Sequence, residues 1–301
     1  MATLKDIRAR IGSVKNVQKI TRAMEMVAAA RLRRAEQRIE HLRPYADAIR
    51  RMTRRASEAA ENIPSLPILQ ERENISKVGL LLVTGDRGLA GPFNSQIIRA
   101  GTRRAGELDG EGANVLWYAS GRRGVSSLEF RGHDLAQGFT GFTDRPAYSD
   151  AREIADALTS AYVDEKVDQV EIIYNGYISP VRQEVRHETL LPLQHADVLG
   201  EDEEEEESEE EEHHRRALWI YEPDPEEILA RLVPDYVEIS IYRALLESTA
   251  SEHGARMTAM RSASDNASEL IDDLTLEANR QRQAEITQEI MEVVAGAEGL
   301  T

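Results

Sequence analysis

Each end of this chain carries a long helical pattern of apolar residues, and no other feature constrains the fold as much. Along residues 3–58, and again along residues 235–296, apolar side chains recur at steps of mostly three or four, the spacing of one helix face. As continuous helices these segments would be roughly 84 and 93 Å long at about 1.5 Å per residue. A domain of this size cannot enclose such a helix. Each apolar stripe therefore needs a partner helix, and the other end of the chain is the obvious one.

The charges of the two ends support this pairing. Residues 1–60 hold 15 Lys and Arg against 6 Asp and Glu, whereas residues 226–301 hold 6 against 15. Opposite charge on flanking positions favours one mixed helix pair over self-association of either helix. The alternative is that each helix is solvated separately with its own charge pattern.

The middle of the chain alternates between short apolar runs and amphipathic segments. We expect strands at 77–83, 113–118, 134–139, 168–174, 181–191 and 217–221, and helices at 93–107, 122–130 and 148–164. This order predicts a Rossmann-like α/β domain with a mainly parallel sheet and antiparallel strands added late.

The predicted organisation has four parts. They are an N-terminal coiled-coil helix at 1–60, a linker at 61–75, the α/β domain at 76–222 and a C-terminal coiled-coil helix at 223–301. Pro44 could bend the first helix, and Pro234 is expected to break the last one into a short and a long piece. Between residues 250 and 268 the inner positions of the last helix are small, which predicts a close crossing near Ala28, Ala29 and Ala30. The alternative is that alanine is simply a good helix former.

The net charge of −17 is dominated by one segment, because residues 201–212 supply 11 acidic side chains. Such a run repels itself, so we expect residues 201–214 to form a disordered external loop. His213 and His214 follow the run and could bind metal, but a solvated loop is the simpler interpretation. The chain has no Cys, which excludes disulfides and thiolate chemistry. It contains no apolar run of about 18 residues, so we expect a soluble or peripherally attached protein.

The sequence shows no group of residues that would carry catalysis, so no catalytic, cofactor-binding or metal-binding residue is assigned. Gly85, Gly88 and Gly91 lie between a strand and a helix, but their spacing is not the dinucleotide-binding pattern, and a tight turn is expected. One alternative is a nucleotide-dependent α/β enzyme with helical arms. The other is a coiled-coil protein that binds nucleic acid through the basic first helix, although that helix lacks interleaved aromatic residues.

Four strings resemble the gamma subunit of F-type rotary ATP synthases. They are IRARIGSVKNVQKITRAMEMVAAARLRRA at 7–35, DRGLAG at 86–91, SIYRALLESTASEHGARMTAMRSASDNA at 240–267 and RQAEITQEIMEVVAGAEGL at 282–300. They fall at both ends and at the entry to the middle domain, in the order that the family has. The acidic run at 201–212 is not part of the family pattern.

The resemblance implies a rotor and not an enzyme. In this family the terminal helices form an antiparallel coiled coil inside a hexamer of alpha and beta subunits. The α/β domain lies against the epsilon subunit and the membrane-embedded ring of c subunits. The implied function is transmission of torque between proton flow through the ring and ATP synthesis on the beta subunits. The implied location is the cytoplasmic side of the cell membrane, held indirectly through the c ring, with no cofactor and no nucleic acid.

The resemblance also implies residues that contact the alpha and beta subunits. Met24 and the basic residues after it match a segment facing an acidic loop of beta, and Arg282 and Gln283 match a polar contact of the last helix. The expected set is Met24, Arg31, Arg33, Arg34, Arg282, Gln283, Thr287 and Gln288.

Overall fold

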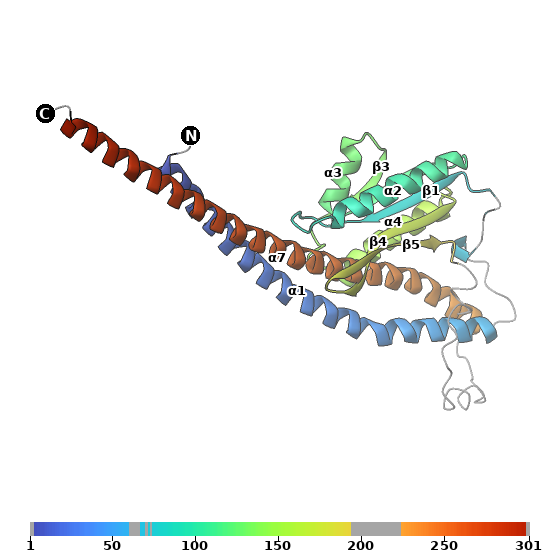
Figure 1. Ribbon diagram of the computed structural model, residues 1–301. Coiled ribbons are helices and arrows are strands. Elements are labelled where there is room, and N and C mark those ends of the chain that lie inside the picture. Colours follow the sequence, from blue (N-terminus) through green and yellow to red (C-terminus); the bar gives the residue numbers. More distant parts are fainter. Residues whose placement is uncertain (1–2, 60–66, 70–71, 73, 194–223, 299–301) are drawn as a thin grey trace. The chain divides into compact units, whose positions relative to one another are not determined.

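The computed structural model describes residues 3–59, 67–69, 72, 74–193 and 224–298 (Figure 1). Its internal contacts divide the chain into two units. One unit contains residues 1–30 and 256–301, and the other contains residues 31–255. The acidic run, residues 61–66, 70, 71 and 73 of the predicted linker at 61–75, and the predicted strand at 217–221 lie outside the described residues.

Two helices run through both units: α1 spans Leu4–Ala59 and α7 spans Pro225–Glu298. The expected break at Pro234 is wrong, because α7 continues through this residue. A proline inside a helix removes one backbone hydrogen bond. Here Leu232, Val233 and Val237 around it are buried in the larger unit, and this packing holds the helix together. Pro44 likewise lies inside α1.

In the smaller unit the two helices pair in antiparallel fashion. Arg261 of α7 donates to Glu25 of α1 at 2.8 Å. The buried residues that the structure describes in this unit recur at steps of mostly three, four or seven along each helix: Ile7, Thr21 and Ala28 on α1, and Arg256, Met260, Ser264, Ala267 and Leu274 on α7. The predicted antiparallel two-helix coil is confirmed.

The larger unit contains a five-stranded sheet in the order β3-β2-β1-β4-β5. The strands are β1 Lys77–Val83, β2 Asn114–Ser120, β3 Leu135–Phe139, β4 Gln169–Ser179 and β5 Arg182–Leu191. The first four are parallel, and β5 pairs with β4 in antiparallel fashion. The structure thus confirms a mainly parallel sheet with a late antiparallel strand, and β4 extends five residues beyond its predicted end.

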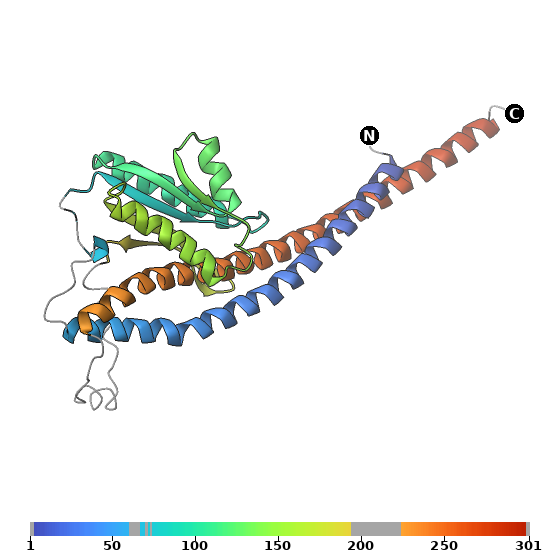
Figure 2. The same cartoon turned by 180° about the vertical axis from the view of Figure 1, so that it is seen from behind.

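Helices cover both faces of this sheet, as Figures 1 and 2 show from opposite sides. α2 (Phe93–Gly110) and α3 (Arg122–Phe130) pack on one face, where Leu80, Leu82 and Ile173 are buried. α4 (Tyr148–Val163) and the first part of α7 pack on the other face, over Leu81, Val83 and Ile172. Alternate residues of each strand therefore serve two separate apolar layers. A short 3-10 helix, η1 (Pro67–Leu69), joins the second layer through Ile68.

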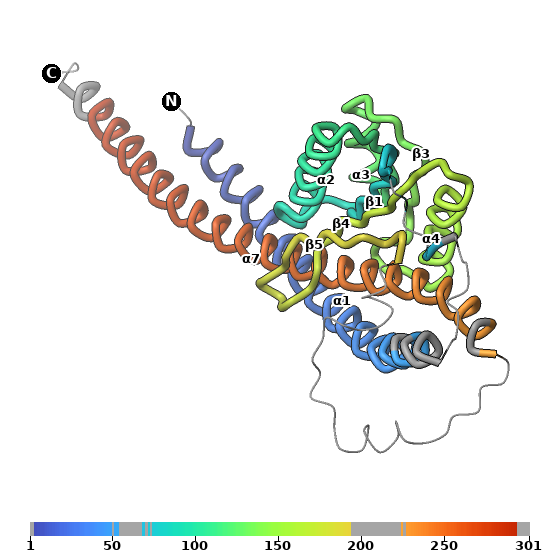
Figure 3. The backbone as a smooth tube through the Cα atoms, turned by 90° about the vertical axis from the view of Figure 1, so that its right-hand side faces the viewer, coloured from blue at the N-terminus to red at the C-terminus, as the bar shows by residue number. Residues whose placement is uncertain are grey.

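One of the small residues of α7, Gly254, has a different neighbour from the one predicted. A side chain at Gly254 would approach the carbonyl oxygen of Pro180 to 3.0 Å. Figure 3 shows the β4–β5 hairpin beside α7. Gly254 therefore admits the hairpin tip to the helix, so the expectation that it serves a crossing with α1 is corrected.

Candidate functional site

The carboxyl ends of β1 and β4 form the point where an α/β sheet of this kind usually binds its ligand. From β1 the chain passes to β2 on one side of it, whereas β4 lies on the other side of β1. The crevice therefore opens between β1 and β4. In this protein α7 fills that crevice. Ser251 Oγ donates to the carbonyl oxygen of Asn175, and a side chain at Gly85 would come within 2.8 Å of the Glu252 carboxylate. The loop that contains Gly85, Gly88 and Gly91, the glycine loop, is thus covered by α7.

Little space remains at this point. The cavity lined by Val83, Thr84, Thr143, Thr249 and Glu252, among others, has a volume of about 10 Å³. That is about the volume a single water needs. The arrangement explains the three glycines as a turn between β1 and α2, and Gly85 in particular as the residue that lets Glu252 approach.

Asp86 organises the loops around the crevice. Its carboxylate accepts hydrogen bonds from the backbone N–H groups of Arg122, Gly141 and Thr143 at 3.0–3.3 Å, and from Thr143 Oγ1 at 3.1 Å. Burial raises the pKa of Asp86, but these hydrogen bonds outweigh it and keep the pKa below its ordinary value. One ionised side chain therefore ties together the loops that follow β1, β2 and β3.

A second buried carboxylate lies on the face of the sheet that α2 covers. Glu171 of β4 is 1% exposed and accepts a two-point hydrogen bond from Arg104 of α2, at 2.8 and 3.0 Å. His187 Nε2 of β5 lies 2.7 Å from it. Burial raises the pKa of Glu171, but the hydrogen bonds from His187 and Arg104 outweigh this and lower the pKa to about 2.

This depressed pKa predicts an acid-sensitive fold. Ionised Glu171 stabilises the folded state above its ordinary pKa of 4.5, and this contribution is lost as the pH falls toward about 2. We expect the loss to reach about 3 kcal/mol, since one pKa unit corresponds to about 1.4 kcal/mol. Urea unfolding of wild type and of Glu171→Gln at pH 7, 4.5 and 3 measures it. The free energies of the two proteins should converge as the pH falls, and parallel curves would contradict the prediction.

Above Glu171 a groove of about 680 Å³ separates α2 from β5. Its walls include Arg99 and Arg103 from α2 and Gln183 and Val185 from β5. Among the described residues no cluster of three or more His, Cys, Asp or Glu side chains is arranged to hold a metal ion. No described helix is long and apolar enough to cross a membrane.

Comparison with known proteins identifies the family. A family model described as ATP synthase matches residues 3–300. The ATP synthase gamma chain of Rubrobacter xylanophilus is 42% identical over 300 residues, covering 100% of this chain and 99% of that protein. The gamma chain of Thermobifida fusca is 41% identical, and the match covers 99% of this chain and 97% of that protein. This chain belongs to the ATP synthase gamma chain family.

Solved structures agree with this assignment. The central stalk and c-ring structure of the Tetrahymena thermophila mitochondrial ATP synthase contains a chain that is 26% identical with a TM-score of 0.60, covering 81% of this chain and 99% of that one. A chain of the Euglena gracilis mitochondrial ATP synthase has a TM-score of 0.66 at 14% identity, covering 99% and 94%. The second likeness supports the fold alone. The family match over residues 3–300 therefore confirms the resemblance that the four strings indicated.

The structure places the predicted contact residues of α1 in two different environments. Met24 is half-buried, and Arg33 and Arg34 are exposed. Arg31 instead donates to Asp144 of the same chain at 2.8 Å. No local pattern could indicate this pair, because Arg31 and Asp144 are 113 residues apart in the sequence.

The predicted contact residues of α7 lie on one exposed stretch of the smaller unit. Arg282, Gln283, Thr287 and Gln288 are all exposed. Thr287 Oγ1 donates to the backbone oxygen of Gln283, and Gln288 donates to Glu292. The register set by Glu25 and Arg261 brings the start of α1, Leu4, close to the level of Arg282. The side chains beyond Arg282 therefore project from a part of α7 that extends past α1.

Proposed function

We propose that this gamma chain is the central rotor stalk of a membrane-attached ATP synthase. It transmits torque between proton flow through the c ring and the catalytic sites on the beta subunits. The observation that carries the proposal is the full-length identity of about 42% to gamma chains from bacteria. The antiparallel helix pair and the filled crevice support it, because both suit a mechanical element better than a nucleotide-binding enzyme. The family match gives no support to nucleic-acid binding.

The chain contributes no catalytic residue in this proposal. Its partners are the alpha and beta subunits around the coiled coil, and the epsilon subunit and c ring at the α/β domain. It is held at the cytoplasmic side of the cell membrane through the c ring. We propose the domain boundaries that are predicted above from the sequence.

Co-purification tests the proposal directly. An affinity-tagged gamma chain, purified from solubilised membranes, should bring down alpha, beta, epsilon and c polypeptides together with ATPase activity. In reconstituted vesicles the complex should pump protons when given ATP. A tagged chain that is recovered alone, or a complex that hydrolyses ATP without pumping, would refute the rotor assignment.

We further propose that Met24, Arg33, Arg34, Arg282, Gln283, Thr287 and Gln288 contact the alpha and beta subunits. All of these side chains except the half-buried Met24 are exposed, which supports this proposal. We propose Arg31 as part of the same set, because its side chain is 40% exposed, and its pairing with Asp144 gives it a second role inside the chain.

The double variant Arg282→Ala with Gln283→Ala tests the α7 part of this surface. We expect coupled ATP turnover to fall about tenfold, since hydrogen bonds to charged groups contribute about 1.5–3 kcal/mol. The thermal unfolding of the isolated chain should change little, because both side chains are exposed. Arg280→Ala, an exposed arginine one half-turn away, is the matched control and should keep wild-type turnover. Unchanged turnover in the double variant would remove both positions from the contact surface.

A further inference from the structure

The two long helices are attached to the α/β domain in different ways. α7 belongs to the apolar core of the domain, where Val233, Val237, Ile241 and Leu245 pack against the sheet and α4. Among the described residues α1 supplies no side chain to that core. Its apolar contacts in this unit include Ile49, which packs with Leu232 and Ile239 of α7. α1 is therefore held mainly by its neighbour helix and by polar contacts.

Three side chains of α1 make these polar contacts with the domain. Arg31 Nη1 donates to Asp144 Oδ2 at 2.8 Å. Arg38, two turns further on, donates to the carbonyl oxygen of Pro146, and to the Tyr242 hydroxyl of α7 at 3.2 Å.

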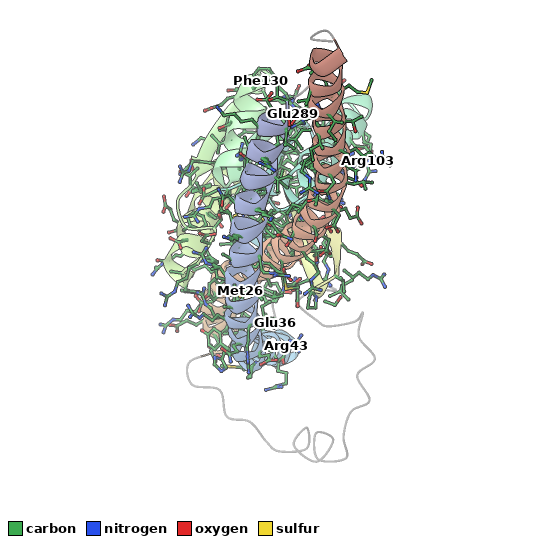
Figure 4. All side chains as sticks on the ribbon, turned by 60° about the vertical axis from the view of Figure 1, so that its left-hand side comes forward. Met26, Glu36, Arg43, Arg103, Phe130 and Glu289 are labelled. Carbon is green, nitrogen blue, oxygen red and sulfur yellow. The ribbon has the colours of Figure 1, made fainter. Side chains whose placement is uncertain are left out.

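Glu36 makes the third contact. It accepts a hydrogen bond from the Tyr177 hydroxyl of β4, and Figure 4 labels it on α1. Two contacts therefore reach the loop at 140–147 between β3 and α4, and one reaches the β4–β5 hairpin.

The loop at 140–147 is itself held firmly. Asp86 accepts hydrogen bonds from Gly141 and Thr143 of this loop. The carbonyl oxygen of Thr143 accepts a hydrogen bond from Thr249 Oγ1 of α7 at 2.9 Å. Arg87 of the glycine loop lies 3.3 Å from the Asp144 carboxylate that Arg31 binds. A load on Arg31 or Arg38 is thus passed to the sheet and to α7.

We propose that Arg31, Glu36 and Arg38 form a clamp with Asp144, Pro146 and Tyr177 that stops α1 from rolling or sliding on α7. The proposal rests on the rotor function and assigns to these residues the transfer of torque from the α/β domain into α1. Arg31, Glu36, Arg38, Asp144 and Tyr177 are positioning residues, since they touch no reacting group.

Directional contacts are needed for this role. Apolar burial is non-directional, so one helix can shift along another while keeping much of its buried area. Hydrogen bonds and ion pairs weaken steeply with distance and angle. A slide of one helical turn, about 5.4 Å, would break all three contacts at once. The clamp lies on a part of α1 that supplies no side chain to the apolar core of the α/β domain.

The test uses the assembled complex in sealed vesicles and the double variant Asp144→Asn with Tyr177→Phe. Asp144→Asn removes the charge that pairs with Arg31, and Tyr177→Phe removes the hydroxyl that donates to Glu36, each with little change in volume. We expect the ratio of protons pumped to ATP hydrolysed to fall at least about threefold, with hydrolysis within about twofold of wild type, because charge-assisted hydrogen bonds of this strength are lost. Glu184→Gln is the matched control. It breaks an exposed ion pair with Arg182 on the same hairpin that does not involve α1, and its ratio should equal that of wild type.

Two further variants separate a clamp from general stability. Asp144→Glu keeps the charge and should restore most of the ratio when Tyr177 is wild type, whereas Asp144→Asn alone should not. The midpoints of thermal unfolding of the isolated chains should lie within a few degrees of each other for the double variant, Asp144→Glu and Asp144→Asn. A wild-type ratio in the double variant, or equal ratios for Asp144→Glu and Asp144→Asn, would overturn the clamp. Wild-type vesicles that fail to pump would instead refute the rotor function itself.

Discussion

Replacing Arg104 by Ala is expected to lower the free energy of unfolding of the α/β domain by about 4 kcal/mol. Glu171 is 1% exposed. Arg104 donates to both of its carboxylate oxygens, from Nη2 to Oε1 at 2.8 Å and from Nε to Oε2 at 3.0 Å. Removing one partner of a buried ion pair typically costs about 3–5 kcal/mol, because the other charge stays buried without compensation. Urea unfolding of the full-length chain measures the change.

The neighbouring residue provides the control. Arg103 lies on the same helix with a side chain that is 78% exposed, and its nearest acidic partner, Glu107, is 4.0 Å away (Figure 4). Exposed pairs of this kind contribute less than about 1 kcal/mol. Arg103→Ala should therefore leave the unfolding midpoint almost unchanged. Equal effects of the two substitutions would show that Glu171 does not depend on Arg104.

Gly121→Ala is expected to destabilise the same domain by about 4 kcal/mol or more. Gly121 precedes α3 with φ of 92°, and an added Cβ would lie 2.2 Å from the carbonyl oxygen of Thr84. Neither side can yield easily, because Gly121 N–H donates to Phe139 and Thr84 N–H donates to Ser120. Backbone strain of about 1–3 kcal/mol adds to an overpacking cost of similar size.

Gly132→Ala separates these two causes. Gly132 also has a positive φ, 73°, but an added Cβ would meet no atom within 4 Å. It should therefore show only the cost of the left-handed conformation, about 1–2 kcal/mol. Urea unfolding and the yield of assembled complex measure both variants. A Gly121→Ala protein as stable as Gly132→Ala would mean that the contact with Thr84 is not tight.

Most of the fold could be predicted because its signals are local. The apolar runs that became β1 and β4, and the three-and-four spacing of the terminal helices, depend on neighbours in the sequence. Pro234 misled the prediction because the packing of Val233 and Val237 against distant strands outweighs the local preference for a break.

The contacts at the candidate site depend on residues that are distant in sequence. Asp86 meets Gly141 and Thr143 more than 50 residues later, and Arg31 meets Asp144 113 residues later. A single carboxylate after a strand gives no periodic signal, so the pairing of Arg31 with Asp144 could not be predicted from the sequence. The side chains that connect the loops to one another, to α1 and to α7 could be identified only once the order of the strands in the sheet was known.

The central claim is that the two ends of the chain wind about each other as an antiparallel axle. Spin-label distance measurements on the assembled complex test it most directly. The chain contains no Cys, so labels can be placed singly at chosen positions of this subunit. Labels at Glu25 and Arg261 should lie close together, across helix axes about 8–10 Å apart. Labels at Glu25 and Glu289 should be roughly 42 Å apart, from 28 residues at about 1.5 Å each. A long distance for the first pair, or a short one for the second, would contradict the axle and the rotor mechanism that depends on it.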